Sequence, residues 1–310
     1  GRRGKTVGSV VAGRRGAGMG VPSGWAIHEG FAPEIFPQIG FPGPPDDRMR
    51  RRFLDAVGQA GAVVFEADAT LRIFEHLIRE GRGLRVDYGI DLDQVRAFAA
   101  ENPRQAVRDR LGVGAGQTLL VSVGTYEPRK AQGLLAAAFA QVVDEYPRAV
   151  LAMVGDRGDA YSGLVRAVVD NFGISDNVRL VPITPDIEDW YLAADAFILA
   201  SDVESLPRSM LEAMAFGTPI LGSAVFGVPE IVEDGVTGFL FDPSCVASAV
   251  QAMRRALRLS RAELAEMGEA GRVLVEATRS SSHYGRAYRI ILGALLSAEE
   301  IDLAAALKSQ

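Results

Sequence analysis

Five short apolar runs recur between residues 111 and 223, and a longer segment with helical spacing follows each of the first four. The runs are LLVSV (119–123), AVLAMV (149–154), NVRLV (177–181), AFILA (196–200) and PILGS (219–223). Polar residues hardly interrupt them, which is typical of strands covered on both faces. These runs therefore predict a buried parallel sheet.

The segments between the runs carry apolar residues at helical spacing. They are AQGLLAAAFAQVVDEY (131–146), YSGLVRAVVDNFG (161–173), IEDWYLAA (187–194) and PRSMLEAMAFG (207–217). Gly173 and Gly217 stand where a helix should stop. Strand and helix in alternation predict an α/β fold with a doubly wound parallel sheet, whose ligands lie beyond the carboxyl ends of the strands. Further helical stretches at about 244–277 and 281–296 close the chain.

The first 110 residues are less regular. Convincing strands are expected only at 25–28 and 61–66, a helix at 67–78, and a Pro/Gly-rich loop at 32–45. A second Rossmann-like half needs more strands, so an incomplete domain is expected here. The predicted division therefore has four parts. They are a flexible basic start (1–24), a partial amino-terminal domain with its linker (25–110), a ligand-binding domain (111–283) and a helical end (284–310).

Composition narrows the function classes. The chain has 310 residues, 48% of them hydrophobic, and a formal charge of −6, so no attraction for nucleic acid is expected. No apolar run approaches the roughly 20 residues that span a bilayer, which predicts a cytoplasmic protein. The basic run RMRRR (48–52) is either a solvated helix face or a peripheral contact with the inner face of a membrane. One cysteine and three scattered histidines predict no metal site.

The stretch ESLPRSMLEAM (204–214) places two glutamates around the start of a helix. Glu204 falls in the loop at the carboxyl end of a strand, Pro207 in the first helical turn and Glu212 on the helix. The backbone N–H groups of Ser205 to Ser209 form an anion site at the helix start. Flanking carboxylates accept hydrogen bonds from hydroxyls, so the layout favours a phosphate between sugar hydroxyls, as in a nucleotide-sugar. The alternative is a pair of surface carboxylates favoured by the helix dipole.

A basic element lies at the same expected edge of the sheet. VGTYEPRKAQ (123–132) carries Arg129 and Lys130 just before a helix. A guanidinium fork and a point charge both suit a diphosphate, and they would stabilise the charge of a departing nucleoside diphosphate without a metal ion. A solvated basic turn is the alternative.

Four segments together resemble the nucleotide-binding half of a retaining GT-B glycosyltransferase of family 4. They are GTYEPRKAQGLLAAAF (124–139), AMVGD (152–156), ASDVESLPRSMLEAMAFGTPILGS (200–223) and GVPEIVEDGVTGFLFDP (227–243). The resemblance covers about 111–290. It implies transfer of a hexose from a UDP- or GDP-sugar to a lipid, glycan or other alcohol with retention, in cell-envelope or polysaccharide biosynthesis, without a metal or other cofactor.

The same resemblance implies roles for particular residues. Glu204 would contact the donor sugar, Glu212 the ribose and Lys130 the diphosphate, with Glu204, Lys130 and Arg129 as the catalytic group. The further positions implied in donor binding are Thr125, Val181, Pro182, Ser205, Leu206 and Pro207. Val181 and Pro182 would meet the base. Thr125 departs from the pattern, because many members carry arginine there, and Arg129 is then expected to supply that second cation.

The amino-terminal part keeps the function open. The early acceptor-side motif of the family has no counterpart, and His28 is the one candidate residue for the acceptor cleft. A chain that lacks the acceptor side of the cleft is expected to bind donor but to turn over slowly or not at all. The alternatives to a transferase are a non-catalytic nucleotide-sugar-binding protein, a truncated inactive transferase, and another GT-B enzyme such as a sugar-nucleotide epimerase. A phosphorylase would need a lysine for pyridoxal phosphate, and none stands in a recognisable setting.

Overall fold

The computed structural model describes residues 24–27, 55–296 and 307. The chain divides into two units. The first comprises Gly1–Gly89, Glu204–Leu206 and Ser281–Gln310, and the second comprises Ile90–Val203 and Pro207–Ser280. The basic run 48–52, the loop 32–45 and His28 lie outside the described residues.

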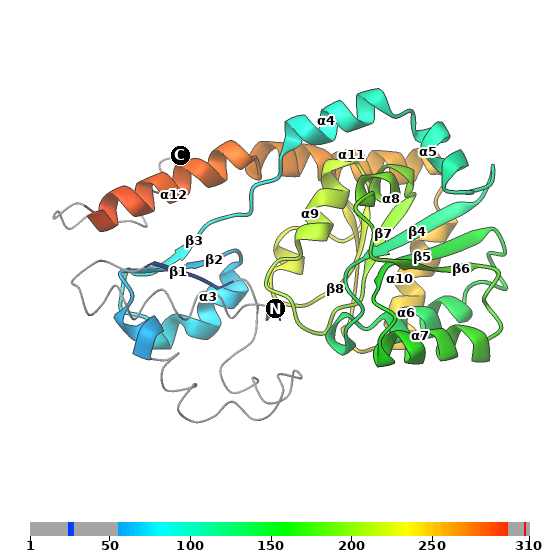
Figure 1. Ribbon diagram of the computed structural model, residues 1–310, viewed down its shortest axis with the longest axis horizontal. Helices are drawn as coiled ribbons and strands as arrows, with labels where there is room; N and C mark the ends of the chain where they lie inside the picture. The colour runs from blue at the N-terminus through cyan, green and yellow to red at the C-terminus, as the bar shows by residue number, and fades with distance from the viewer. Residues whose placement is uncertain (1–23, 28–54, 297–306, 308–310) are drawn as a thin grey trace. The chain divides into compact units, whose positions relative to one another are not determined.

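A parallel six-stranded sheet forms the centre of the second unit (Figure 1). Its order is β6-β5-β4-β7-β8-β9. The strands are β4 (Thr118–Val123), β5 (Ala149–Asp156), β6 (Val178–Pro182), β7 (Ala196–Leu199), β8 (Ile220–Ser223) and β9 (Gly238–Phe241). The first five are the apolar runs expected from the sequence. The edge strand β9 was not expected, because its residues GFLF stand between Gly235 and Pro243 in a segment that is typical of a turn.

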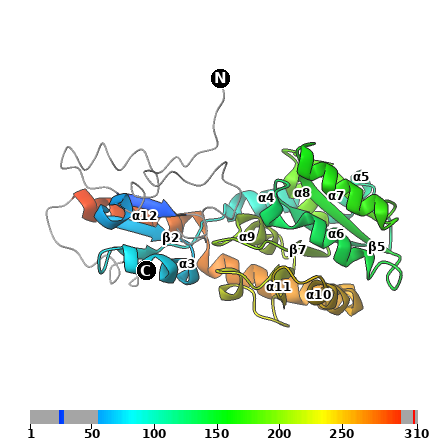
Figure 2. The same ribbon diagram turned by 90° about the horizontal axis from the view of Figure 1, so that it is seen from below.

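Helices cover both faces of this sheet, as Figures 1 and 2 show. One face packs against α6 (Gln132–Ala140), α7 (Ala160–Asn171) and α10 (Val246–Arg258), and the other against α5 (Arg104–Arg110) and α8 (Ile187–Ala193). Leu120 faces the first layer, whereas Leu119 and Val121 face the second. Both sides of the strand are therefore apolar, which explains the runs without alternation.

The remaining helices of the second unit are α4 (Leu92–Glu101), α9 (Arg208–Ala215) and α11 (Arg261–Thr278). Gly173 and Gly217 follow the ends of α7 and α9 with φ of 65° and 75°, as expected for helix-ending glycines. The stretch 244–277 is two helices rather than one. Leu259 is extended, and the side chain of Ser260 caps α11 in a reciprocal pair with Glu263.

The first unit holds a three-stranded parallel sheet with the order β1-β2-β3. Its strands are β1 (Gly24–Ile27), β2 (Ala62–Phe65) and β3 (Gly83–Arg85), and its helices are α3 (Asp68–Phe74) and α12 (Ser281–Leu296). No helix in the described ranges is long and apolar enough to cross a membrane.

The boundary between the units differs from the expected one at residue 110. The segment 90–110 groups with the second unit, where Ile90 N–H donates to Arg279 O (2.7 Å) and Val107 of α5 packs in the core. The helix α12 has the expected bounds, 281–296, and groups with the first unit. Burial against distant elements decides both assignments.

Candidate functional site

The loop that follows β4 is anchored by a buried tyrosine. Tyr126 is fully buried, its hydroxyl donates to Met153 O (3.0 Å), and its N–H donates to Gly155 O (3.2 Å). Burial raises the pKa of Tyr126, so the hydroxyl stays a neutral donor at physiological pH. The loop is therefore fixed to the carboxyl end of β5, and the basic residues that follow it start from a defined position.

The end of β5 requires a glycine. Gly155 has φ of 124°, and a Cβ at this position would collide with the carbonyl oxygen of Gly124. The next residue, Asp156, is buried, accepts a hydrogen bond from Gly158 N–H (2.7 Å) and pairs with Arg166 (3.0 Å). Burial opposes the charged form of Asp156, yet hydrogen bonds from Ser162 and Gly158 and the charge of Arg166 lower its pKa. The VGD segment thus packs directly against the loop after β4.

The expected cations lie on a short 3₁₀ turn, Pro128–Lys130, between this loop and α6. The Arg129 Nε donates to Glu127 Oε2 (3.1 Å), and the Arg129 carbonyl accepts from Asp202 N–H (2.8 Å). The side chain of Lys130 runs over Gly124, where a Cβ would lie 3.8 Å from the lysine Cε. The two cations are therefore held at the carboxyl end of β4.

Glu127 holds this loop together and was not singled out in the sequence. Besides Arg129, its carboxylate accepts a hydrogen bond from the hydroxyl of Thr125 (3.2 Å) and lies 3.7 Å from the guanidinium of Arg157. Thr125 stands where many family members carry arginine, and Arg129 is expected to replace that cation. Both residues thus hydrogen-bond to one carboxylate, that of Glu127. Glu127 could have been identified from the sequence, because it directly precedes the turn that carries both cations.

The helix α9 carries the second expected carboxylate. Pro207 is its N-cap, and its carbonyl accepts the N–H of Met210 (3.1 Å). Glu212 receives a hydrogen bond from the buried Tyr191 hydroxyl on Oε2 (2.9 Å) and from the Arg208 Nε on Oε1 (2.9 Å). Burial and the neighbouring Glu212 raise the pKa of Tyr191. The carboxylate is therefore oriented from two sides, by residues that sequence reasoning did not select.

Three residues of the loop between β7 and α9, Glu204–Leu206, group with the first unit. Val203 and Pro207 on either side of them belong to the second. Glu204, Ser205 and Leu206 are all buried. Within the first unit the hydroxyl of Ser205 lies 2.9 Å from that of Thr70 and donates to Glu66 Oε2 (3.4 Å). The role expected for Glu204 stays a prediction.

Val181 and Pro182 end β6, two strands away from β4. Val181 is half-buried and Pro182 exposed, and the next residue, Ile183, donates its N–H to Asp156 O (3.2 Å). The second unit therefore gathers the loop 124–130, the end of β6 and the start of α9 at the carboxyl ends of its parallel strands. The described residues contain no group of three side chains suited to a metal ion.

Comparison with known proteins is decisive for the family. Residues 103–274, more than half of the chain, match the family model described as "Glycosyl transferases group 1". The chain belongs to this family.

Curated glycosyltransferases match between about half and two thirds of the chain. D-inositol 3-phosphate glycosyltransferase of Streptomyces avermitilis is 34% identical over 200 residues, which are 60% of this chain and 42% of the relative. The enzyme of the same description from Thermobispora bispora is 37% identical over 166 residues, 51% of this chain and 38% of that one. The matched region thus spans less than half the length of these curated relatives.

Solved structures show the fold of this group 1 glycosyl transferase chain. Anabaena Alr3699/HepE, in complex with UDP and glucose, aligns with a TM-score of 0.78 at 20% identity over 92% of this chain and 75% of that one. WaaG, a glycosyltransferase involved in lipopolysaccharide biosynthesis, aligns with a TM-score of 0.74 at 22% identity over 88% and 76%. The parallel sheets with their helices and these neighbours make this an α/β chain of GT-B architecture.

Proposed function

We propose that the chain binds a nucleotide-sugar and contributes the donor side of a retaining hexosyl transfer to an alcohol of a glycan or lipid. One observation carries the proposal. The cations Arg129 and Lys130 follow the carboxyl end of β4, and the oriented carboxylate of Glu212 lies on α9, the helix that begins after β7 of the same parallel sheet. Cations suit a diphosphate and a carboxylate suits ribose hydroxyls, so the two together fit a nucleoside diphosphate better than either fits alone.

The diphosphate would lie against the turn 128–130. Lys130 supplies a compact charge above Gly124, and Arg129 supplies a guanidinium whose Nε is already held by Glu127. Charge grows on the departing diphosphate as the glycosidic bond breaks, and fixed cations stabilise that charge more than they stabilise the ground state. This arrangement requires no metal ion, and a metal-independent reaction is part of the proposal.

The ribose would be held by Glu212. A carboxylate offers about four acceptor positions. Tyr191 and Arg208 use one on each oxygen, so acceptor positions remain for two sugar hydroxyls. The base would lie beyond Val181 and Pro182. Glu204 would contact the donor sugar.

Relatives support the choice of substrates. Alr3699/HepE has been solved with UDP-glucose, and the curated relatives are named as D-inositol 3-phosphate glycosyltransferases. We therefore place the reaction in cell-envelope or polysaccharide biosynthesis, with a UDP- or GDP-sugar as donor, in the cytoplasm or at the inner face of the membrane.

Calorimetric titration with UDP, GDP and ADP tests donor binding, and two variants test the division of roles. Glu212→Gln is expected to weaken binding of the nucleoside diphosphate itself by about 1.5–3 kcal/mol, since it removes a charged acceptor. Glu204→Gln is expected to leave that affinity nearly unchanged and to impair use of the sugar donor. Glu266→Gln, on the exposed face of α11, is the matched control.

Three results would reject parts of this proposal. Absence of binding by all three nucleotides would reject the donor site. Equal losses of UDP affinity in both glutamate variants would reject the division of roles. Inverted anomeric configuration of the product, read by NMR, would reject retention while leaving the donor site intact.

A further inference from the structure

A cavity lies at the opposite edge of the same sheet. Its volume is about 370 Å³, and its lining includes Arg104, Asp195, Phe216, Thr218, Arg261 and Leu264. Asp195 immediately precedes β7, and its N–H donates to Leu119 O near the start of β4 (2.8 Å). The cavity is therefore at the amino ends of the strands, whereas the loop 124–130 follows the carboxyl end of β4. All of its lining residues belong to the second unit.

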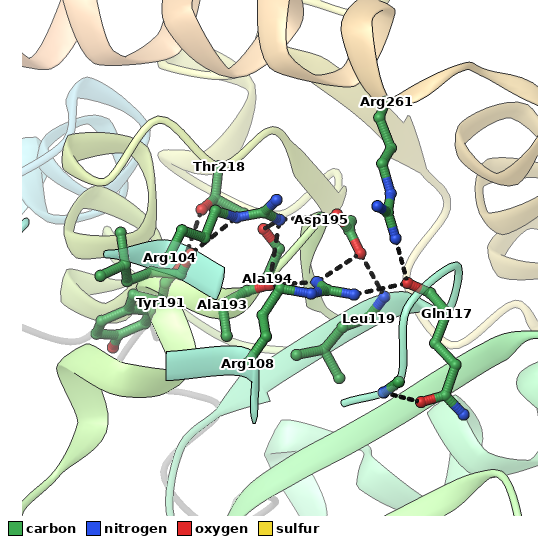
Figure 3. A network of polar contacts seen from close by, with 12 residues as sticks. Arg104, Arg108, Gln117, Leu119, Tyr191, Ala193, Ala194, Asp195, Thr218 and Arg261 are labelled. Carbon is green, nitrogen blue, oxygen red and sulfur yellow. Dashed lines mark hydrogen bonds and ion pairs between the residues drawn. The ribbon is translucent and has the colours of Figure 1, made fainter. Parts of the chain in front are cut away.

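Three guanidinium groups gather around one carboxylate in this region (Figure 3). The Arg104 Nη2 lies 2.7 Å from Asp195 Oδ1, and the Arg108 Nη1 lies 3.0 Å from Asp195 Oδ2. Arg261 reaches in from the first turn of α11 and donates through Nη2 to Gln117 O (3.0 Å). Arg104 and Arg108 thus pair with the single carboxylate of Asp195 while Arg261 lies nearby, which leaves an excess of positive charge beside the cavity.

The pKa of Arg108 records the crowding of these cations. Burial lowers it, the ion pair with Asp195 opposes that effect, and the charges of Arg104 and Arg261 lower it further. Like charges held this close repel one another, and an anion placed among them would relieve the repulsion. Arg272, at the rim, does not add to the excess, because Glu269 and Glu276 both pair with it.

Two of the arginines retain donors. Arg104 uses Nε and Nη2 on the carbonyls of residues 192–194 and on Asp195, and its side chain is 42% exposed. Arg261 is exposed and uses Nη2 alone. Within the described part of the chain, the Nη1 of Arg104 and the Nε and Nη1 of Arg261 make no hydrogen bond. The backbone carbonyls already hold Arg104 in place, so an anion meets an ordered Nη1 donor.

We propose that this cavity binds the phosphate group of a small phosphorylated molecule, held between Arg104 and Arg261. A dianion matches the excess positive charge, and the guanidinium fork matches phosphate oxygens in geometry. The volume is within the range of small-molecule sites and exceeds what phosphate alone fills. Phe216 and Leu264 provide an apolar wall for the rest of the molecule. The site is separate from the proposed donor site and does not depend on it.

Calorimetry at constant ionic strength, with inorganic phosphate and glucose 1-phosphate as probes, tests the proposal. Both probes are expected to bind the full chain, and Arg261→Ala is expected to weaken each by about tenfold or more, because it removes a charged donor. Arg254→Ala is the matched control, since Arg254 is another surface arginine, on α10, paired with Glu145 outside the cavity. Far-UV circular dichroism of both variants checks that the fold is kept.

The outcomes separate clearly. Loss of affinity in Arg261→Ala but not in Arg254→Ala supports the site. No binding of either probe at millimolar concentration overturns it, as does equal affinity in the two variants. A second substitution, Arg104→Lys, keeps the charge but loses the Nε and Nη2 hydrogen bonds that hold the side chain in place, and it should weaken phosphate binding as well. Unchanged affinity in that variant would contradict the role given to Arg104.

Discussion

Charged residues differ between the side of the six-stranded sheet where its strands begin, here called the amino edge, and the side where they end, the carboxyl edge. At the amino edge, Arg108 and Asp195 have side chains only 3% exposed and pair with each other inside the unit. At the carboxyl edge, Glu127 and Arg129 are about a quarter exposed and belong to one short loop. A buried pair is costly to break, whereas a partly exposed loop pair contributes little to stability. We therefore expect loss of the buried charge of Asp195 at the amino edge to affect folding, and loss of a loop charge at the carboxyl edge to affect nucleotide binding.

The largest expected effect is at the amino edge. Asp195→Asn removes the charge partner of the buried Arg108, and it is expected to lower the free energy of unfolding by about 3–5 kcal/mol. Urea denaturation followed by circular dichroism measures this loss. Asp109→Asn, on the exposed face of α5, is the control and should change stability by less than about 0.5 kcal/mol. A loss below about 1 kcal/mol for Asp195→Asn would erase the contrast between the two edges.

The next effect is at the carboxyl edge and on binding. Lys130→Ala is expected to weaken nucleoside diphosphate binding by about 1.5–3 kcal/mol, or roughly 10- to 150-fold, through loss of a charged donor. Its urea midpoint is expected to stay close to that of the parent chain. Calorimetry and denaturation on the same preparation separate the two quantities. Loss of stability without loss of affinity would reverse the assignment of this edge.

The smallest effect concerns pH and sharpens the comparison. The folded state lowers the pKa of Asp156, so its contribution to stability is present above the unfolded pKa of about 3.9 and is lost as pH falls through the lower folded value. Asp156→Asn should therefore cost about 1 kcal/mol near pH 7 and progressively less as the pH is lowered below about 3.9. Asp144→Asn, at an exposed position, is the control, and its free energy of unfolding is measured at the same pH values. A cost for Asp156→Asn that does not change between these pH values would show that the carboxylate charge is not the cause.

The parts of the fold that sequence reasoning predicted are those fixed by local pattern. Leu119, Leu120 and Val121 form an unbroken apolar run because both faces of β4 are covered, and such a run is visible in the sequence. The break between α10 and α11 had a visible signal as well, since Ser260 and Glu263 have the spacing of a capping box. Reading 244–277 as one stretch overlooked it.

The parts that sequence reasoning missed depend on contacts between distant segments. Arg108 and Asp195 are 87 positions apart, and Tyr191 and Glu212 belong to different helices. Neither pair has a spacing that a periodic pattern can reveal. In the candidate site, the cations and the glutamates each come from one short segment of sequence and their roles stay a prediction, whereas the partners that orient them could not be predicted. The assignment of 90–110 to the second unit has the same origin, because tertiary burial decides it.

The close approach of Gly155 to Gly124 also limits how such a chain can change over generations or in a directed-evolution library. No side chain fits at Gly155, so a substitution there would have to displace the loop 124–130. Ile183, which follows β6 and is 60% exposed, has no such constraint. Substitution at Ile183 is therefore expected to give folded variants more often than substitution at Gly155.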